Sequence, residues 1–215
     1  MPDALIADAT QTPLPVVEGR TSGILGRIAE KGVALAIWNR PGPKGLADWL
    51  DTLPAESLPK GRFIARPRDV PADLVALCER AGLDDSPPRA TLIADVARLA
   101  ERFARLAGTC CVDLRLEAID HDSCWRFHRD HVGLRLNVTY RGPGTQWPPL
   151  DQEMRARRAQ RRYRGPLNEL PRFAAALFKG VPRAGVGSVL HRSPPVAARG
   201  LTRLFLCLNE EPNED

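Results

Sequence analysis

Apolar residues in the N-terminal half of the chain recur every three or four positions, the spacing of one face of an α-helix. The clearest case is residues 89–107, where Gly108 marks the end and the repeating residues are Leu92, Val96, Leu99, Phe103 and Leu106. Shorter helices are predicted over 46–53 and 71–80, and the continuous apolar run 32–40 predicts a buried strand.

After Gly108 the period changes to two, which is typical of half-buried strands. Val112, Leu114 and Leu116 alternate with Asp113, Arg115 and Glu117. Further short strands are predicted in SCWRFHRD, LRLNVTY, FAAALFKG, GVGSVLHR and LTRLFLCLN, separated by Pro and Gly turns. Short strands spaced by turns indicate an α+β fold: a C-terminal jelly roll (a double-stranded β-helix, cupin-like) with an N-terminal helical subdomain packed on it.

The same patterns predict the division of the chain. Residues 1–20 are expected to form a flexible arm, and residues 21–108 a mostly helical subdomain with one strand. Residues 109–209 are expected to form a jelly-roll half that binds a metal and carries a basic insertion at 150–170. Residues 210–215 complete the chain as an acidic tail.

Composition narrows the class of protein without naming a function. The 215 residues are 43% hydrophobic and 27% charged, the ordinary range of globular domains, which excludes wholesale disorder. No apolar run approaches the roughly 18 residues that a membrane span needs. The first twenty residues show no secretory signal pattern and none of the five Cys forms a C-x-x-C pair, so we expect a cytoplasmic protein with reduced thiols.

The positive charge is concentrated in one segment. The chain carries a net charge of +5, and RARRAQRRYR at 155–164 holds six Arg and no acidic residue. Such a segment favours an anionic partner, either nucleic acid or an anionic small-molecule substrate, although a solvated surface is the commoner reason for an Arg cluster. No nucleic-acid-binding motif accompanies it.

Three side chains suggest a metal site. His128 and Asp130 are two residues apart on a predicted strand, so alternation would place them on one face. His191 lies far along the chain, at the end of another predicted strand. Two His and one carboxylate form the facial triad of non-haem Fe(II) oxygenases, which leaves three metal positions open.

Other ligand sets compete with this one. His131 would replace Asp130 in a cupin-like site, and Cys124 shares the alternation face of His128, so a zinc site is an alternative. Zinc would bring no redox chemistry and would favour a role in metal homeostasis. His121 is expected to lie in a turn that flanks the strand.

The stretch GSVLHRSPPVAARGLTRLFLCLN resembles the closing strands of the 2-oxoglutarate-dependent dioxygenases. The resemblance implies that His128, Asp130 and His191 bind Fe(II) and serve catalysis. It also implies that Arg203 binds the distal carboxylate of 2-oxoglutarate. Arg126 and Arg199 are rival anchors, and Phe205 departs from the family, which often has a small hydroxyl residue two positions after the Arg.

A second resemblance covers most of the chain. The pattern CWRFHRD…VTYRGPGTQW…FKG…HRSPP is similar to a bacterial family of unknown function, which brings no activity with it. The sequence therefore predicts an Fe(II), 2-oxoglutarate-dependent oxygenase that hydroxylates an anionic substrate. The alternatives are a zinc-binding protein without redox activity and an Arg-rich nucleic-acid-binding module.

Overall fold

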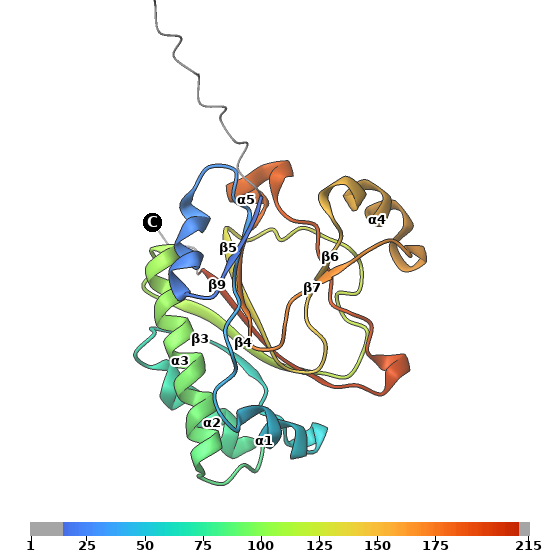
Figure 1. The fold of residues 1–215 in the computed structure, drawn as a ribbon. Coiled ribbons are helices and arrows are strands. Elements are labelled where there is room, and N and C mark those ends of the chain that lie inside the picture. The colour runs from blue at the N-terminus through green and yellow to red at the C-terminus, as the bar shows by residue number, and fades with distance from the viewer. Residues whose placement is uncertain (1–14, 211–215) are drawn as a thin grey trace, which may run out of the picture.

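A seven-stranded sheet forms the centre of the protein in a computed structural model that describes residues 15–210. The strand order is β1-β2-β8-β5-β9-β4-β3, and every neighbouring pair except β1 and β2 is antiparallel (Figure 1). The strands are β1 (Val16–Gly19), β2 (Leu35–Trp38), β3 (Gly61–Ala65), β4 (Val112–Ile119), β5 (Leu134–Arg141), β8 (Ala175–Lys179) and β9 (Arg203–Glu210).

Three helices cover one face of this sheet (Figure 1). They are α1 (Leu46–Thr52), α2 (Val70–Arg80) and α3 (Pro87–Ala107). A 3-10 helix, η1 (Ser22–Ala29), packs beside β2. Alternate strand residues, such as Leu114, Leu136 and Leu206, pack against the apolar stripe of α3, which includes Val96 and Phe103. The three helices predicted from periodicity are confirmed.

The ends of α3 follow from local chemistry. Pro87 occupies its first turn, where a missing N–H costs nothing, and Gly108 ends it with a left-handed φ of 73°. Phe103 is fully buried on the sheet side, so truncating it to Ala would cost about 3–5 kcal/mol of stability.

A second, smaller layer faces the other side of the sheet. Strands β6 (Gln146–Trp147) and β7 (Asn168–Glu169) pair with each other, and two isolated bridges, His128 with His191 and Gln146 with Arg192, extend the layer. It packs over β2 and β8 through an apolar cluster that includes Ile37, Phe178, Trp147 and Val189. The two layers give the expected jelly-roll-type arrangement.

Short helical segments complete the chain. The region of the predicted insertion holds α4 (Glu153–Ala159) between η3 (Leu150–Gln152) and η4 (Gln160–Arg162), and it projects beside the small layer (Figure 1). The remaining segments are α5 (Val181–Ala184), η2 (Ala55–Ser57), η5 (Gly185–Gly187) and η6 (Ala197–Arg199). None of the helices in the described part of the chain combines the length and apolar character needed to cross a bilayer.

The half of the sheet that the small layer leaves open is polar. Cross-strand pairing aligns its side chains in rows, because directly opposite residues lie on the same face. One row runs through Arg135, Asn209 and Asp113, and the next runs through Asn137, Cys207, Arg115 and Arg62. A sheet with one face in the helix-packed core and charged rows on the other provides a rigid floor for a site.

Several expectations need correction. The N-terminal half supplies two strands to the sheet within 21–108, β2 and β3, rather than one, so a separate helical subdomain is not confirmed. Val16–Gly19 of the expected flexible arm forms β1, while residues 1–14 and 211–215 lie outside the described residues. The GVGSVLHR and SCWRFHRD segments are not strands; they pair only through isolated bridges, at His191 and Arg192 in the first and at His128 in the second.

Candidate metal centre

Direct backbone pairing brings His128 and His191 together. Each residue donates its N–H to the carbonyl of the other at 2.9 Å, the closed pair of an antiparallel bridge. The imidazole centroids are 4.7 Å apart, and the His191 ring also contacts Phe178 at 4.8 Å. Two segments remote in the chain are thereby fixed side by side.

A close backbone approach positions Asp130. The Val181 N–H donates to the Asp130 carbonyl at 2.8 Å, and the Gly180 N–H donates to Gly133 at 3.0 Å. A Cβ on Gly180 would lie 1.9 Å from the Val132 carbonyl oxygen, so only glycine allows the chain leaving β8 to approach this closely. The Asp130 side chain is then held by Arg135, whose Nη1 donates to Oδ1.

His128, Asp130 and His191 offer one ligand atom each within 4.8 Å of one another. The Nδ1 atoms of His128 and His191 lie 2.8 and 3.1 Å from the carbonyls of Arg126 and Val189. Because a carbonyl only accepts, Nδ1 carries the hydrogen in the neutral rings, and each Nε2 presents a lone pair. These Nε2 atoms are 3.9 and 3.5 Å from the Asp130 carboxylate.

Burial leaves one ligand atom without a partner. Asp130 is 4% exposed, and its Oδ2 has no hydrogen-bond donor among the described residues. Such an atom is costly unless something else satisfies it. Burial also lowers the pKa of His191, although the Asp130 charge opposes this, so the ring is neutral near pH 7 and able to bind a cation. The donor set suits a divalent transition metal.

The insertion supports the two histidine segments from behind. The Gln160 Oε1 accepts the Phe127 N–H at 2.8 Å, and the Glu153 Oε1 accepts the Leu190 N–H at 3.0 Å. Phe127, Leu190 and Tyr163 also form a small apolar cluster between the insertion and the two histidine segments. The residues that precede both histidines are therefore held by hydrogen bonds to the same segment, the insertion at 150–170.

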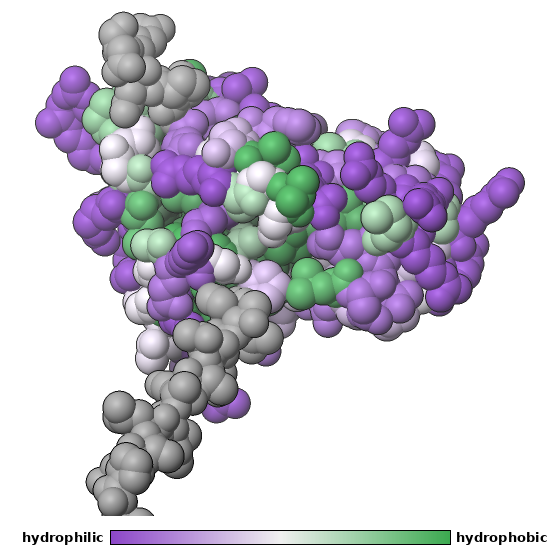
Figure 2. Space-filling model, turned by 90° about the horizontal axis from the view of Figure 1, so that it is seen from above, coloured by the Kyte–Doolittle hydropathy of each residue, from purple (hydrophilic) through white to green (hydrophobic). Residues whose placement is uncertain are grey.

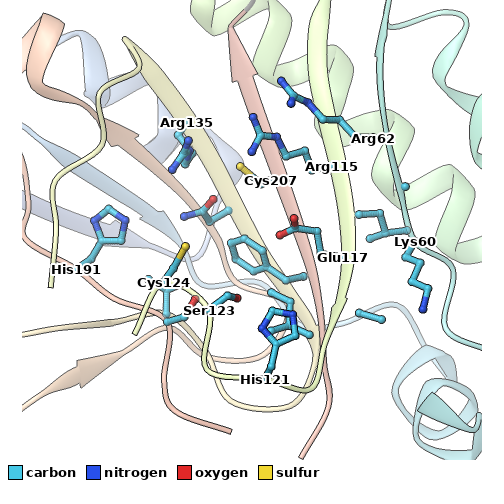
Figure 3. A pocket seen from close by; sticks show the side chains of 18 of the residues that line it. Lys60, Arg62, Arg115, Glu117, His121, Ser123, Cys124, Arg135, His191 and Cys207 are labelled. Atoms are coloured by element: carbon cyan, nitrogen blue, oxygen red, sulfur yellow. The ribbon is translucent and has the colours of Figure 1, made fainter. Parts of the chain in front are cut away.

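An open cavity of about 600 Å³ lies over the polar half of the sheet. His128 and His191 border it together with Ser193, Asn137, Phe205 and Cys207. Figure 3 shows His191 and Arg135 toward one end and Lys60 at the other, with Arg62 and Arg115 side by side between them. The candidate metal site thus opens into a space large enough for a small molecule.

A hydrogen-bond chain along one row of the sheet links the Asp130 carboxylate to the middle of the floor. The Arg135 Nε donates to Asn209 Oδ1 at 2.8 Å, and Asn209 Nδ2 donates to Asp113 Oδ2 at 3.0 Å. Burial alone would raise the pKa of Asp113, but hydrogen bonds from Arg62, Asn209 and Arg115 outweigh it and lower that pKa. The Asp130 carboxylate is therefore connected by hydrogen bonds to side chains on β5, β9 and β4.

The arginines predicted to bind the co-substrate lie in three different environments. Arg203 is fully buried and donates to Pro143 O at 2.7 Å, Ser193 Oγ at 2.9 Å and Thr139 Oγ1 at 3.2 Å. It lies behind Ser193, which lines the cavity. Arg126 is exposed and stacks over the ring of Trp125, and Arg199 is exposed on η6, so neither side chain borders the cavity.

The competing ligand residues are not brought into the cluster. His131 is exposed and borders a different cavity, beside Arg183. Cys124 and His121 line the same cavity as His191 but are outside the group of three ligand atoms. Within residues 15–210, the His128, Asp130 and His191 group is the one cluster of at least three such side chains close enough to share an ion.

The Arg cluster of the insertion is a surface feature. All six Arg of 155–164 are exposed on the α4 lobe, and none of the residues 150–170 lines the large cavity. Seen from above, the protein is largely hydrophilic on this side (Figure 2). Substrate binding at the insertion was the expectation, but the cations that border the cavity come from the β-sheet region instead. Nucleic-acid binding by the lobe stays a prediction.

Nearly the whole chain matches one protein-family model. A model described as a protein of unknown function, DUF1826, matches residues 19–209. The chain belongs to the DUF1826 family. The match runs from before η1 into β9, includes the three candidate metal ligands of this DUF1826 protein, and agrees with the resemblance to a family of unknown function seen in the sequence. None of the curated proteins matches it significantly.

The solved structures found to be similar to this DUF1826 protein are all of low identity to it. A dioxygenase for auxin oxidation from Arabidopsis thaliana, in complex with 2-oxoglutarate, is 12% identical with a TM-score of 0.47, and the alignment covers 94% of each chain. The apo Kdo hydroxylase KdoO, a non-heme Fe(II) alphaketoglutarate-dependent dioxygenase, is 11% identical with a TM-score of 0.48, covering 92% of this chain and 90% of that one. A prolyl-4-hydroxylase from Pseudomonas putida is 16% identical with a TM-score of 0.36, covering 80% and 96%.

Sequence reasoning missed several residues of the site. Arg135, Asn137 and Asn209 were not singled out, although each alternates with buried leucine or valine on its strand. The signal was present in that alternation, but a polar strand face ordinarily points to solvent. Only the sheet order shows that three such faces lie side by side under one cavity.

Proposed function

We propose that this protein is an Fe(II)- and 2-oxoglutarate-dependent oxygenase that hydroxylates a small molecule. The observation that carries the proposal is the convergence of His128, Asp130 and His191, which offer one ligand atom each within 4.8 Å of one another, while the buried Asp130 Oδ2 has no hydrogen-bond partner among the described residues. Two imidazoles and one carboxylate fit iron held at three positions, and when bound the ion would supply redox chemistry at the positions left open.

The surrounding residues keep this ligand set in place. The carbonyls of Arg126 and Val189 fix the two histidine tautomers, and Arg135 fixes the rotation of the Asp130 carboxylate. Such outer contacts orient metal ligands and raise their basicity. The Phe178 ring against His191 shields the inner side of the site from water.

Arg203 fits the role of co-substrate anchor. Its buried guanidinium donates only to a carbonyl and two hydroxyl groups, with no carboxylate within ion-pair distance in the part of the chain described. Burial lowers its pKa to about 10, so it remains protonated at neutral pH. A buried cation with neutral partners favours an incoming carboxylate, and Ser193, which accepts from Arg203, borders the cavity.

The test measures bound metal and turnover separately. The full chain, reconstituted anaerobically with Fe(II), is expected to hold one ion and to convert 2-oxoglutarate to succinate when oxygen is admitted. His128→Ala, Asp130→Ala and His191→Ala should each abolish metal binding and turnover. His131→Ala is the matched control, because His131 is exposed and outside the cluster.

Two results would overturn the proposal. Metal content unchanged in His191→Ala would place the ion elsewhere. Stoichiometric zinc binding without any succinate from the iron-loaded chain would favour the non-redox, zinc-binding alternative. Arg203→Lys keeps the charge but loses the planar fork, so it should raise the 2-oxoglutarate concentration for half-maximal turnover about ten-fold or more while metal content stays unchanged.

A further inference from the structure

The cavity carries an excess of positive charge on the side away from the metal cluster. Four cationic side chains border it, those of Lys60, Arg62, Arg115 and Arg135, against one carboxylate, that of Glu117. Figure 3 shows these residues around one space, with the first three on the side opposite His191. A concave surface lined by one sign of charge concentrates ligands of the other sign.

A buried carboxylate holds two of these cations side by side. Arg62 and Arg115 are directly opposite on β3 and β4, where like charges would repel. Both donate to Asp113, Arg62 at 2.8 and 3.1 Å and Arg115 at 3.2 Å. Asp113 lies beneath them and does not border the cavity, so a ligand meets the guanidinium groups first.

Arg115 retains hydrogen-bonding capacity in this arrangement. It contacts Asp113 through Nη2, while its buried Nε has no partner among residues 15–210. Its side chain is 34% exposed, so the fork is held in place by the protein and accessible from the cavity. A fixed guanidinium of this kind suits a planar carboxylate or a phosphate.

We infer that Arg62 and Arg115, assisted by Lys60, form a subsite for the oxyanion of the substrate, a carboxylate or a phosphate carried on an apolar body. Ile119 and Phe205 border the same cavity and would contact that body. The inference rests on the proposed function, because the anion is taken to belong to the molecule oxidised at the metal.

The sheet sets the length of such a substrate. Arg115, Cys207 and Asn137 are consecutive partners in one row, so the Arg115 and Asn137 backbones are two strand spacings, about 10 Å, apart. Arg135, which contacts the ligand Asp130, lies two residues from Asn137 on β5. The anion would therefore bind about 10 Å across the floor from the side where oxidation occurs.

The experiment compares 3-phenylpropionate with its neutral amide by titration calorimetry on the full chain. The acid should bind at least about ten-fold more tightly, since charge-assisted hydrogen bonds carry the recognition. Arg115→Gln and Arg62→Gln should each weaken acid binding about ten-fold and leave amide binding unchanged. Arg66→Gln is the matched control, because Arg66 is exposed just after β3 and does not border the cavity.

The outcomes separate this inference from the proposed function. Equal affinity for acid and amide, or acid binding unaffected by both Arg115→Gln and Arg62→Gln, would overturn the subsite. Lys60→Gln removes an exposed charge without changing the Asp113 hydrogen bonds. A smaller but measurable loss of acid binding in this variant would show that the losses in the arginine variants are not caused by misfolding. Succinate formation by the wild-type chain tests the oxygenase proposal independently, and either result can fail while the other holds.

Discussion

Two buried aspartates on opposite faces of the same sheet differ in how they are satisfied. Asp95, on the helix-covered face, is 2% exposed and accepts from Arg40 through both oxygens, at 2.7 and 2.8 Å. The Tyr140 hydroxyl adds a third bond at 2.7 Å. Asp130, on the cavity face, is 4% exposed but leaves Oδ2 without a donor in the described chain.

The difference separates a structural carboxylate from a candidate ligand. Burying a charge is costly unless it is paired and hydrogen-bonded, and Asp95 meets that condition with protein groups alone. Asp130 meets it only in part, through Arg135 at Oδ1, and its Oδ2 lies 3.5 Å from the His191 Nε2. Incomplete satisfaction at a buried position is therefore the feature that points to a bound cation.

The largest expected effect is on stability and comes from replacing Asp95, the aspartate with a purely structural role. Asp95→Ala leaves the Arg40 guanidinium and the Tyr140 hydroxyl buried without their acceptor, and should lower the free energy of unfolding by about 3–5 kcal/mol. Asp130→Ala in the metal-free chain should cost less, because Arg135 keeps its bond to Asn209 and is 20% exposed. Urea unfolding followed by circular dichroism measures both; equal losses would contradict the distinction.

The arginines that support these two aspartates should differ in their effect on metal affinity, where the Asp130 side is the sensitive one. Arg135→Met removes the group that orients Asp130, so affinity for Fe(II) or Zn(II) should fall about 10–100-fold. Arg40→Met should destabilise the fold yet leave metal affinity unchanged, since the partners of Arg40 are Asp95, the Phe173 carbonyl and the Trp38 ring, none of which is a candidate metal ligand. Competition against a fluorescent chelator gives both affinities. Wild-type affinity in Arg135→Met would remove Arg135 from this role.

Periodicity was sufficient to predict the three helices of the N-terminal half and the long strands, but not α4 or α5. The stripe of α3 and the alternation in β4, β5 and β9 each reflect one buried face, which the sequence encodes directly. Strand β3 was missed because its five residues carry exposed Arg62 and Ile64, and its pairing with β4 is a tertiary property.

The closeness of His128, Asp130 and His191 was anticipated for a reason that is only partly right. Alternation on a strand was expected to place His128 beside Asp130, yet the segment is irregular and pairs only at His128. What places Asp130 is the glycine contact between Gly180 and the Val132 carbonyl, together with Arg135. A residue type at a given spacing suggests a ligand, whereas its supporting contacts depend on segments that the spacing does not reveal.

The smallest expected effect concerns acid. Burial alone would raise the pKa of Asp95, but hydrogen bonds and charge from Arg40, with the Tyr140 hydroxyl, lower it below the usual value. The unfolded chain then binds the proton more readily, so stability from Asp95 is present above about pH 4 and is lost as pH falls through the folded pKa.

The Asp95→Asn variant has no carboxyl group to titrate at this position. Comparing it with the wild type therefore isolates the contribution of Asp95 ionisation to the pH dependence of stability. The difference in free energy of unfolding between the two chains should shrink as the pH falls from about 6 to about 3, by no more than about 1.4 kcal/mol per pH unit. Other carboxylates whose pKa is lowered, such as Asp113, are present in both chains and cancel. A constant difference over this range would mean that the Arg40 pair does not stabilise the charged form of Asp95, and the contrast with Asp130 would then rest on geometry alone.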